Sequence, residues 1–149
     1  MFLFTHQDLD TALRLGSATL LGGIIGMERE SHGKEAGFRT YALVCLGSAL
    51  TMIVSTEIYE LYKDSGHVDP SRIAAQVVSG IGFIGAGAIM RFPEKIRGLT
   101  TAAGIWTASG IGLACGMGQY RPAILTTLLT LVILVVFSKI DRIFGGHDK

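Results

Sequence analysis

Three glycines of the chain, Gly80, Gly82 and Gly85, have the G-x-G-x-x-G spacing that in many enzymes holds the pyrophosphate of a dinucleotide. That chemistry requires a strand before the glycines, a helix after them and an acidic residue about 20 residues further on. Here the motif lies inside an unbroken apolar run, and no Asp or Glu occurs between Lys95 and Ile140. We therefore interpret these glycines as helix-packing residues and not as a cofactor site.

Charged and hydroxyl side chains gather at the ends of the apolar runs. They could form a salt-bridged network, or a binding surface for an anion, a cation or a partner protein. For Glu28, Arg39 and Arg97, which stand at predicted helix ends, we favour a network, whereas Lys34 and Lys95 are typical of solvated loops. The full set comprises Glu28, Arg29, Glu30, Arg39, Thr40, Arg97, Thr100 and Thr101.

A second group of polar residues stands near the other ends of the apolar runs. Its acidic members are Glu57, Glu60, Asp64 and Asp69. Carboxylates of this kind can hold Mg²⁺ through water, which makes Asp69 the metal candidate, although helix capping is its simpler role. Arg72 follows it closely, and Gln76 could bond to a neighbouring helix or contact a ligand. No other cofactor is predicted.

No catalytic constellation is visible in the sequence. The histidines fall in predicted loops or tails, and no serine has the G-x-S-x-G context of a nucleophile elbow. The two cysteines, Cys45 and Cys115, lack metal-binding spacing, and we expect them to be buried and unpaired. We therefore expect that the protein is not an enzyme.

The elements that carry these residues are predicted to be membrane-spanning helices. Of 149 residues 49% are hydrophobic and only 17% are charged, and the segments 73–90, 98–120 and 122–138 contain no charged residue. About 20 apolar residues in a helix cross the hydrocarbon core of a bilayer. We predict an all-α polytopic membrane protein of about five spans, at about 9–27, 39–59, 73–92, 99–117 and 122–137, within one domain, 1–149.

The distribution of Lys and Arg over the predicted loops indicates an orientation. Nine lie on the side that holds the C-terminus, including Arg142 and Lys149, and three lie on the other side. By the positive-inside rule, this bias predicts an external N-terminus and a cytoplasmic C-terminus. The net charge of +1 gives no reason to expect nucleic acid as a partner.

Small residues recur on one side of several predicted spans, where they would let helix backbones approach closely. The packing glycines are Gly22, Gly26, Gly80, Gly82, Gly85, Gly87, Gly104 and Gly112. Together they predict a centre built from the first, third and fourth spans. On a helical wheel the small residues of the third span cover about half its circumference, opposite Val77, Ile81 and Ile84. We expect that span at the bundle centre or at a dimer contact, with the fifth span at the periphery.

Four stretches of the sequence resemble the MgtC/SapB family of bacterial membrane proteins. They are "LLGGIIGMERE", "AGFRTYALVCLGSAL", "DPSRIAAQVVSGIGFIGAGAIM" and "IRGLTTAAGIWTASGIGLACGMG". The resemblance implies a bacterial inner-membrane protein of about five spans that is linked to growth at low Mg²⁺. It also implies contact with other membrane proteins, such as a P-type ATPase or ATP synthase.

The resemblance assigns the family's motif positions to the first polar set, to Asp69, Arg72 and Gln76 of the second, and to the glycines of the third span. It also assigns Gly37, Pro70 and Gly98. Pathogen-associated members carry a soluble C-terminal regulatory domain, and we expect none here. The predicted function is therefore that of a regulatory or interaction protein of the inner membrane that is linked to magnesium or phosphate homeostasis. Its predicted contacts are lipid and a membrane ATPase or ATP synthase. Homo-oligomers are compatible with this prediction. The alternative is a small transporter or channel for Mg²⁺ or another ion, whose path is lined by Asp69, Gln76 and the polar network that includes Glu28, Arg39 and Arg97.

Overall fold

The computed structural model describes residues 6–66 and 68–139, and it confirms the all-α class. The helices are α1 (His6–Ser31), α2 (Phe38–Tyr62), the 3₁₀ turn η1 (Lys63–Ser65), α3 (Ser71–Gly87), α4 (Leu99–Gly116), α5 (Tyr120–Val132) and the π-helical η2 (Ile133–Phe137). A hairpin of two short strands, β1 (Met90–Arg91) and β2 (Ile96–Arg97), joins α3 to α4. Arg142 and Lys149, which entered the orientation count, lie outside the described residues.

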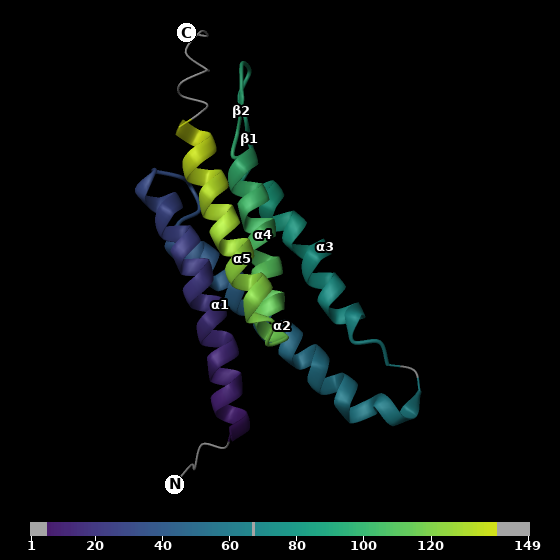
Figure 1. Cartoon of the computed structure of the whole chain (residues 1–149). Helices are drawn as coiled ribbons and strands as arrows, with labels where there is room; N and C mark the ends of the chain where they lie inside the picture. Colours follow the sequence, from purple (N-terminus) through teal and green to yellow (C-terminus); the bar gives the residue numbers. More distant parts are fainter. Residues whose placement is uncertain (1–5, 67, 140–149) are drawn as a thin grey trace.

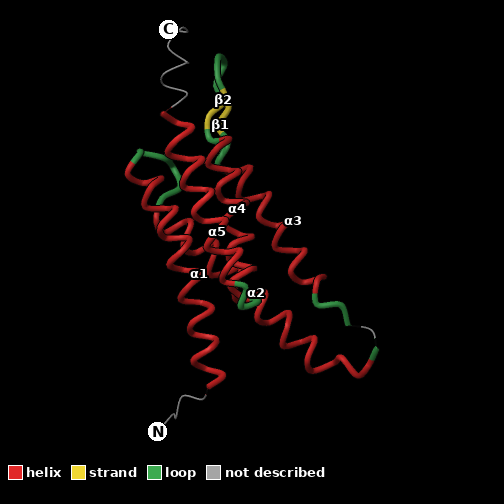
Figure 2. Tube along the Cα trace, in the orientation of Figure 1, coloured by secondary structure: helices red, strands yellow, loops and turns green. Residues whose placement is uncertain are grey.

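Successive helices run in opposite directions, so the connections gather at two ends of an elongated bundle (Figures 1 and 2). The α1–α2 loop, the hairpin and the end of α5 lie at one end, which we call the hairpin end. The α2–α3 and α4–α5 connections lie toward the other end. Helix α4 contacts all four of the other helices and is the centre of the bundle.

Close packing of α1, α2 and α4 depends on glycines of α1 and α4. A Cβ at Gly112 would lie 2.3 Å from the backbone oxygen of Cys45, and one at Gly104 would lie 2.4 Å from the Tyr41 hydroxyl. On α1, a Cβ at Gly22 would lie 2.6 Å from the Cys45 sulfur. Atoms of α2 thus occupy the space where a side chain at each of these glycines would begin. The α2 backbone therefore lies in a groove made by small residues.

The third helix does not lie at the centre of the helix bundle. The expectation of a central position is therefore wrong, and the expectation of a dimer contact stays a prediction. Ile81 is buried, although the wheel placed it on the outward side, and Gly85 is the α3 glycine that approaches α4, at Ala102. A Cβ at Gly80, Gly82 or Gly87 would meet nothing within 4 Å. The reason is that α2, with Tyr41, Cys45 and Ala49 on its buried side, already occupies the groove of α4.

The chain leaves the third helix earlier than predicted. We expected this span to continue to Phe92, but α3 ends at Gly87 and the next residues enter the hairpin, with Met90 opposite Arg97 and Arg91 opposite Ile96. Pro93 favours an extended conformation at the residue before it and is well suited to the turn that follows. Phe92 and Lys95 close this turn with reciprocal backbone hydrogen bonds of 2.9 and 3.3 Å.

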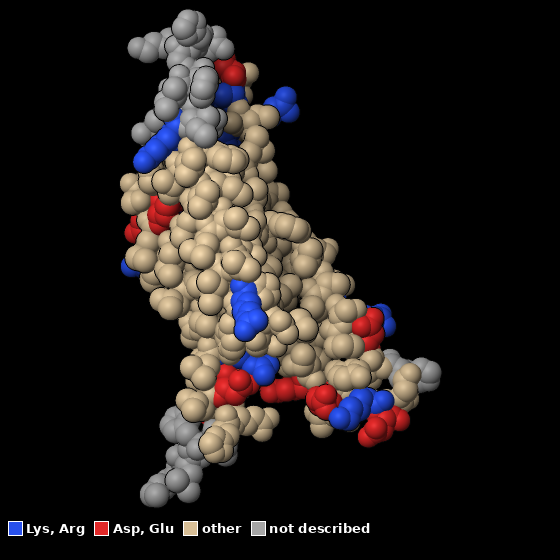
Figure 3. Space-filling view, in the orientation of Figure 1, with Lys and Arg blue, Asp and Glu red and all other residues tan. Residues whose placement is uncertain are grey.

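Two segments of the described chain are long and apolar enough to cross a membrane, Phe38–Ser65 and Tyr120–Phe137. The predicted number of about five spans is not confirmed by this criterion and stays a prediction. Helix α3 has only 17 residues, and the glycine and threonine residues of α4 lower its hydropathy. Figure 3 shows an uncharged surface between two ends that carry most of the visible charges. The fifth helix lies at the periphery, as expected, with Leu125, Leu128 and Leu129 exposed.

An arginine of α1 lies at the end of α4 that is opposite the hairpin. Arg14 pairs with Asp10 at 2.7 Å, and its Nη1 donates a hydrogen bond of 2.9 Å to the backbone oxygen of Gly116. The last carbonyls of a helix have no partner within the helix and carry partial negative charge. Arg14 therefore caps α4.

Candidate functional site

The predicted polar residues divide between the two ends of the bundle. The hairpin end holds Glu28, Arg29, Glu30, Arg39, Thr40, Arg97, Thr100 and Thr101. Asp69 and Arg72 lie at the start of α3, near the opposite end, and Gln76 lies one turn further along that helix. The structure therefore does not bring Asp69 or Gln76 together with the residues of the hairpin end.

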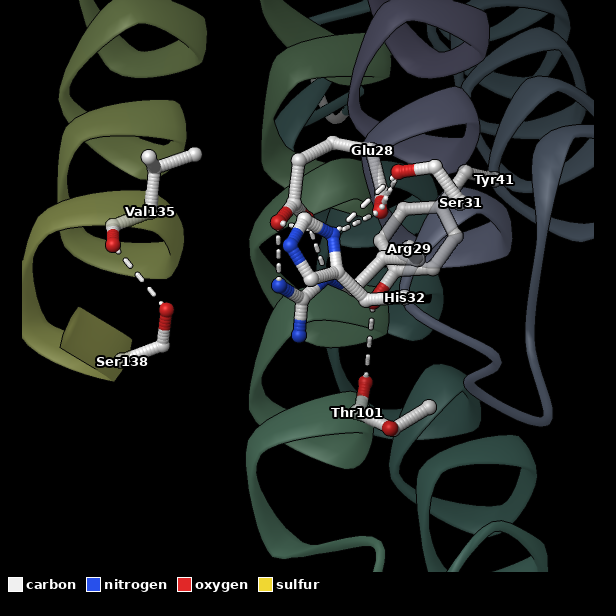
Figure 4. A network of polar contacts seen from close by, with 8 residues as sticks. All are labelled: Glu28, Arg29, Ser31, His32, Tyr41, Thr101, Val135 and Ser138. Carbon is white, nitrogen blue, oxygen red and sulfur yellow. Dashed lines mark hydrogen bonds and ion pairs between the residues drawn. The ribbon is translucent and has the colours of Figure 1, made fainter. Parts of the chain in front are cut away.

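A buried ion pair forms the core of the hairpin end (Figure 4). The Arg29 side chain is only 5% exposed, and its Nη2 donates a hydrogen bond of 2.7 Å to Glu28 Oε1, while its Nε contacts the other carboxylate oxygen. His32 Nδ1 lies 3.1 Å from Glu28 Oε1. Removal of one member would leave a buried charge without its partner, which costs several kcal/mol, about 3 to 5 for a buried pair.

Glu30 points to a different neighbour although it follows this pair directly. Its Oε2 accepts a hydrogen bond of 2.8 Å from the backbone N–H of Phe38, the first residue of α2. A Cβ at Gly37 would lie 2.6 Å from the same oxygen. A carboxylate at a helix N-terminus satisfies a free N–H and complements the helix dipole. Glu30 thus fixes the start of α2 to the end of α1.

Tyr41 is a residue of this end that sequence reasoning missed. It is fully buried, and its hydroxyl donates a hydrogen bond of 3.3 Å to the backbone oxygen of Thr101 (Figure 4). The ring fits because Gly104 has no side chain. A tyrosine within an otherwise apolar run was a usable signal, since a buried hydroxyl needs a partner. The sequence could not indicate that this partner lies on α4.

A pocket of about 880 Å³ opens beside the ion pair. Its polar lining includes Arg29, Lys34, Arg97, Thr100 and Thr101, which come from the α1–α2 region, the hairpin and the start of α4. Its apolar lining includes residues of the α5 end. Four of the predicted network residues therefore share one pocket. Glu30, Arg39 and Thr40 line a separate, smaller hollow of about 300 Å³.

Asp69 stabilises the start of α3. Its Oδ1 accepts hydrogen bonds from the Ser71 backbone N–H at 2.8 Å and from the Ser71 hydroxyl at 2.7 Å. The Ser71 hydroxyl, followed by the Ser71 N–H, holds the pKa of the Asp69 carboxyl below its ordinary value. Among the described residues, no three His, Cys, Asp or Glu side chains lie together as metal ligands, so a Mg²⁺ site at Asp69 stays a prediction.

The chain is similar to a family of known membrane proteins over nearly its whole length. The model of the MgtC family matches residues 15–143. Over 130 residues the chain is 49% identical to the putative magnesium transporter YhiD of Escherichia coli (strain K12), covering 86% of this chain and 60% of that protein. No solved protein structure shows a significant match.

Two further relatives are similar to most of this chain. Protein MgtC of Salmonella typhimurium (strain LT2) is 46% identical over 119 residues, which cover 80% of this chain and 48% of that protein. Protein SapB of Bacillus subtilis (strain 168) is 42% identical over 148 residues, which cover 97% and 64%. The chain therefore spans about half to two thirds of the length of these relatives.

Proposed function

Because this chain belongs to the MgtC family, we propose that it is a membrane protein of magnesium homeostasis that acts by binding another membrane protein. Family membership and the two apolar helices support a membrane location. The name of the YhiD relative supports a link to magnesium. A P-type ATPase or ATP synthase is the proposed partner, and the charged hairpin end is proposed to face the cytoplasm.

One observation carries this proposal, namely the open outer face of α3. Gln76, Gly80, Phe83 and Gly87 recur at intervals of three or four residues and therefore share one side of the helix. All four are exposed in the part of the chain that the structure describes, and Phe83 is 86% exposed. We call this side the α3 outer face. It lies opposite Ile81 and Gly85, which pack inward.

The composition of the α3 outer face favours a protein neighbour over lipid. Lipid chains gain little from contact with glycine, whereas a second helix can approach Gly80 and Gly87 closely enough to pack along its whole length. Gln76 carries an amide that lipid cannot satisfy, and a hydrogen bond to a neighbouring helix would satisfy it. Phe83 supplies a large apolar side chain between the two glycines. A partner helix therefore explains all four residues together.

Replacing Gly80 with leucine tests this proposal. Because a Cβ at this position meets nothing within 4 Å, the chain should fold as before, while a partner helix would be held away. We expect at least about a tenfold loss of the partner that co-purifies from native membranes, as measured by quantitative mass spectrometry. The matched control is Gly47→Leu on α2, another exposed helix glycine with nothing within 4 Å. Unchanged co-purification with Gly80→Leu would show that this face is not used.

A flux measurement separates the proposal from the transporter alternative. Liposomes that contain only this protein should take up Mg²⁺ no faster than protein-free liposomes, because the proposed action requires a partner. Uptake that is lost on Asp69→Asn or Gln76→Ala would favour the transporter instead.

A further inference from the structure

The pocket at the hairpin end, whose ligand nothing above assigns, has the residues of an anion site. We propose that it binds a phosphate group, carried either by an anionic phospholipid or by free phosphate. The pocket lining shares no residue with the α3 outer face, and this inference does not depend on the proposed function.

The charge of the pocket lining favours an anion. Lys34, Arg29 and Arg97 line it, against Glu35 as its one carboxylate. Arg29 already pairs with Glu28, but neither Lys34 nor Arg97 forms an ion pair with any described residue. These two exposed cations therefore remain available to a ligand, and Arg side chains suit phosphate because their N–H groups can bind two oxygens at once.

The backbone and hydroxyl groups of the pocket add donors of the same kind. Thr100 and Thr101 belong to the first turn of α4, which begins at Leu99 without a side-chain cap. The first N–H groups of a helix have no partner within the helix and favour negative charge. Only Gly98 separates Arg97 from this turn. The Arg97 guanidinium lies 5.7 Å from the centre of the Phe92 ring, a contact that restrains the side chain. Cations and helix donors thus border the same space.

The apolar side of the pocket adds a surface that a lipid could use. Ile133, Leu134 and Phe137 from the end of α5 line it, together with Leu99. A phospholipid has a phosphate for the cations and acyl chains for this apolar wall, whereas free phosphate would use only the polar part. Because both sources present the same phosphate chemistry, the experiment must distinguish them.

Two variants remove the proposed contacts and one matched variant leaves them. Arg97→Gln and Lys34→Gln each remove an exposed cation of the lining, so neither disturbs the buried Arg29–Glu28 pair. Arg91→Gln is the control, because Arg91 is an exposed arginine of the same hairpin that does not line the pocket. Thermal unfolding of the wild type and of the three purified variants in detergent establishes that all four proteins are folded.

The binding test has two arms. In the first, the full chain is placed in nanodiscs of phosphatidylglycerol and phosphatidylcholine. Native mass spectrometry then measures which lipid stays bound when the protein is released from the nanodisc. In the second, inorganic phosphate is titrated into the protein in a neutral detergent by calorimetry. We expect Arg97→Gln or Lys34→Gln to weaken binding by about tenfold or more in one arm, with Arg91→Gln like the wild type.

The two arms identify the source or overturn the proposal. Selective retention of phosphatidylglycerol that depends on Arg97 and Lys34 supports a lipid headgroup. Phosphate binding with the same dependence, without lipid selectivity, supports a free anion. Absence of binding in both arms would overturn the proposal, as would an equal loss with Arg91→Gln, since that result would reflect general attraction to positive charge.

Discussion

Gly112→Leu is expected to separate α2 from α4 and to destabilise the bundle by at least about 3 kcal/mol. A Cβ at this position would lie 2.3 Å from the backbone oxygen of Cys45 and 2.7 Å from the Ser48 Cβ, so backbone and not only side chains must move. The movement would also break the hydrogen bond of 3.0 Å from the Cys45 thiol to the Ala108 oxygen. Thermal unfolding in detergent measures the loss.

The control for this variant lies two residues away on the same helix. A Cβ at Gly110 meets nothing within 4 Å, so Gly110→Leu adds the same side chain without a clash. Its unfolding temperature should stay near that of the wild type. If the two variants unfold alike, helix propensity or general hydrophobicity would explain the result, and the close approach of α2 and α4 would not.

Gly98→Ala is expected to have the second large effect, because two separate costs meet at this residue. Gly98 has a φ of +86°, a left-handed conformation that costs other residues about 1 to 2 kcal/mol. In addition, a Cβ would lie 1.9 Å from the backbone oxygen of Ala88, where α3 passes into the hairpin. We expect the hairpin to move away from the start of α4, so that trypsin cleaves faster after Lys95 and the unfolding temperature falls.

Gly33→Ala separates the two costs at Gly98. Gly33 has a similar φ of +62°, but a Cβ there would meet nothing within 4 Å. This variant should lose only about 1 kcal/mol, the cost of the backbone conformation. An equally small loss for Gly98→Ala would mean that the contact with Ala88 relaxes freely and does not hold the hairpin in place.

Much of the helical architecture could be predicted from single stretches of sequence. The charge-free runs indicated the third, fourth and fifth helices, and the small residues that recur on one side of the fourth span indicated close helix packing. The proline of "RFPEKIR" marks the hairpin, but the apolar residues before it, Ile89 and Met90, resembled a continuing helix. The pairing of Met90 with Arg97 depends on a contact across the turn, which apolar periodicity does not report.

The neighbours of each helix were harder to predict. A stripe of glycines indicates that a helix permits close approach, but it does not identify the helix that approaches. On α2 the fully buried residues Tyr41, Cys45 and Ala49 recur every four residues, and this pattern of mixed sizes was less conspicuous than the glycines of α3. The same limit applies at the hairpin end, where the sequence indicated Arg29 and Thr101 but not the tyrosine between their helices.

The central claim is that the α3 outer face binds another membrane protein, and a photo-crosslink from position 83 tests it most directly. In one variant benzoylphenylalanine replaces Phe83. In a control variant benzoylphenylalanine replaces Leu128, which is an exposed residue of α5. In native membranes, we predict that position 83 crosslinks to a different polypeptide, that Gly80→Leu abolishes this product, and that position 128 does not form it. Adducts with lipid alone, or a product that contains only two copies of this chain, would contradict the claim.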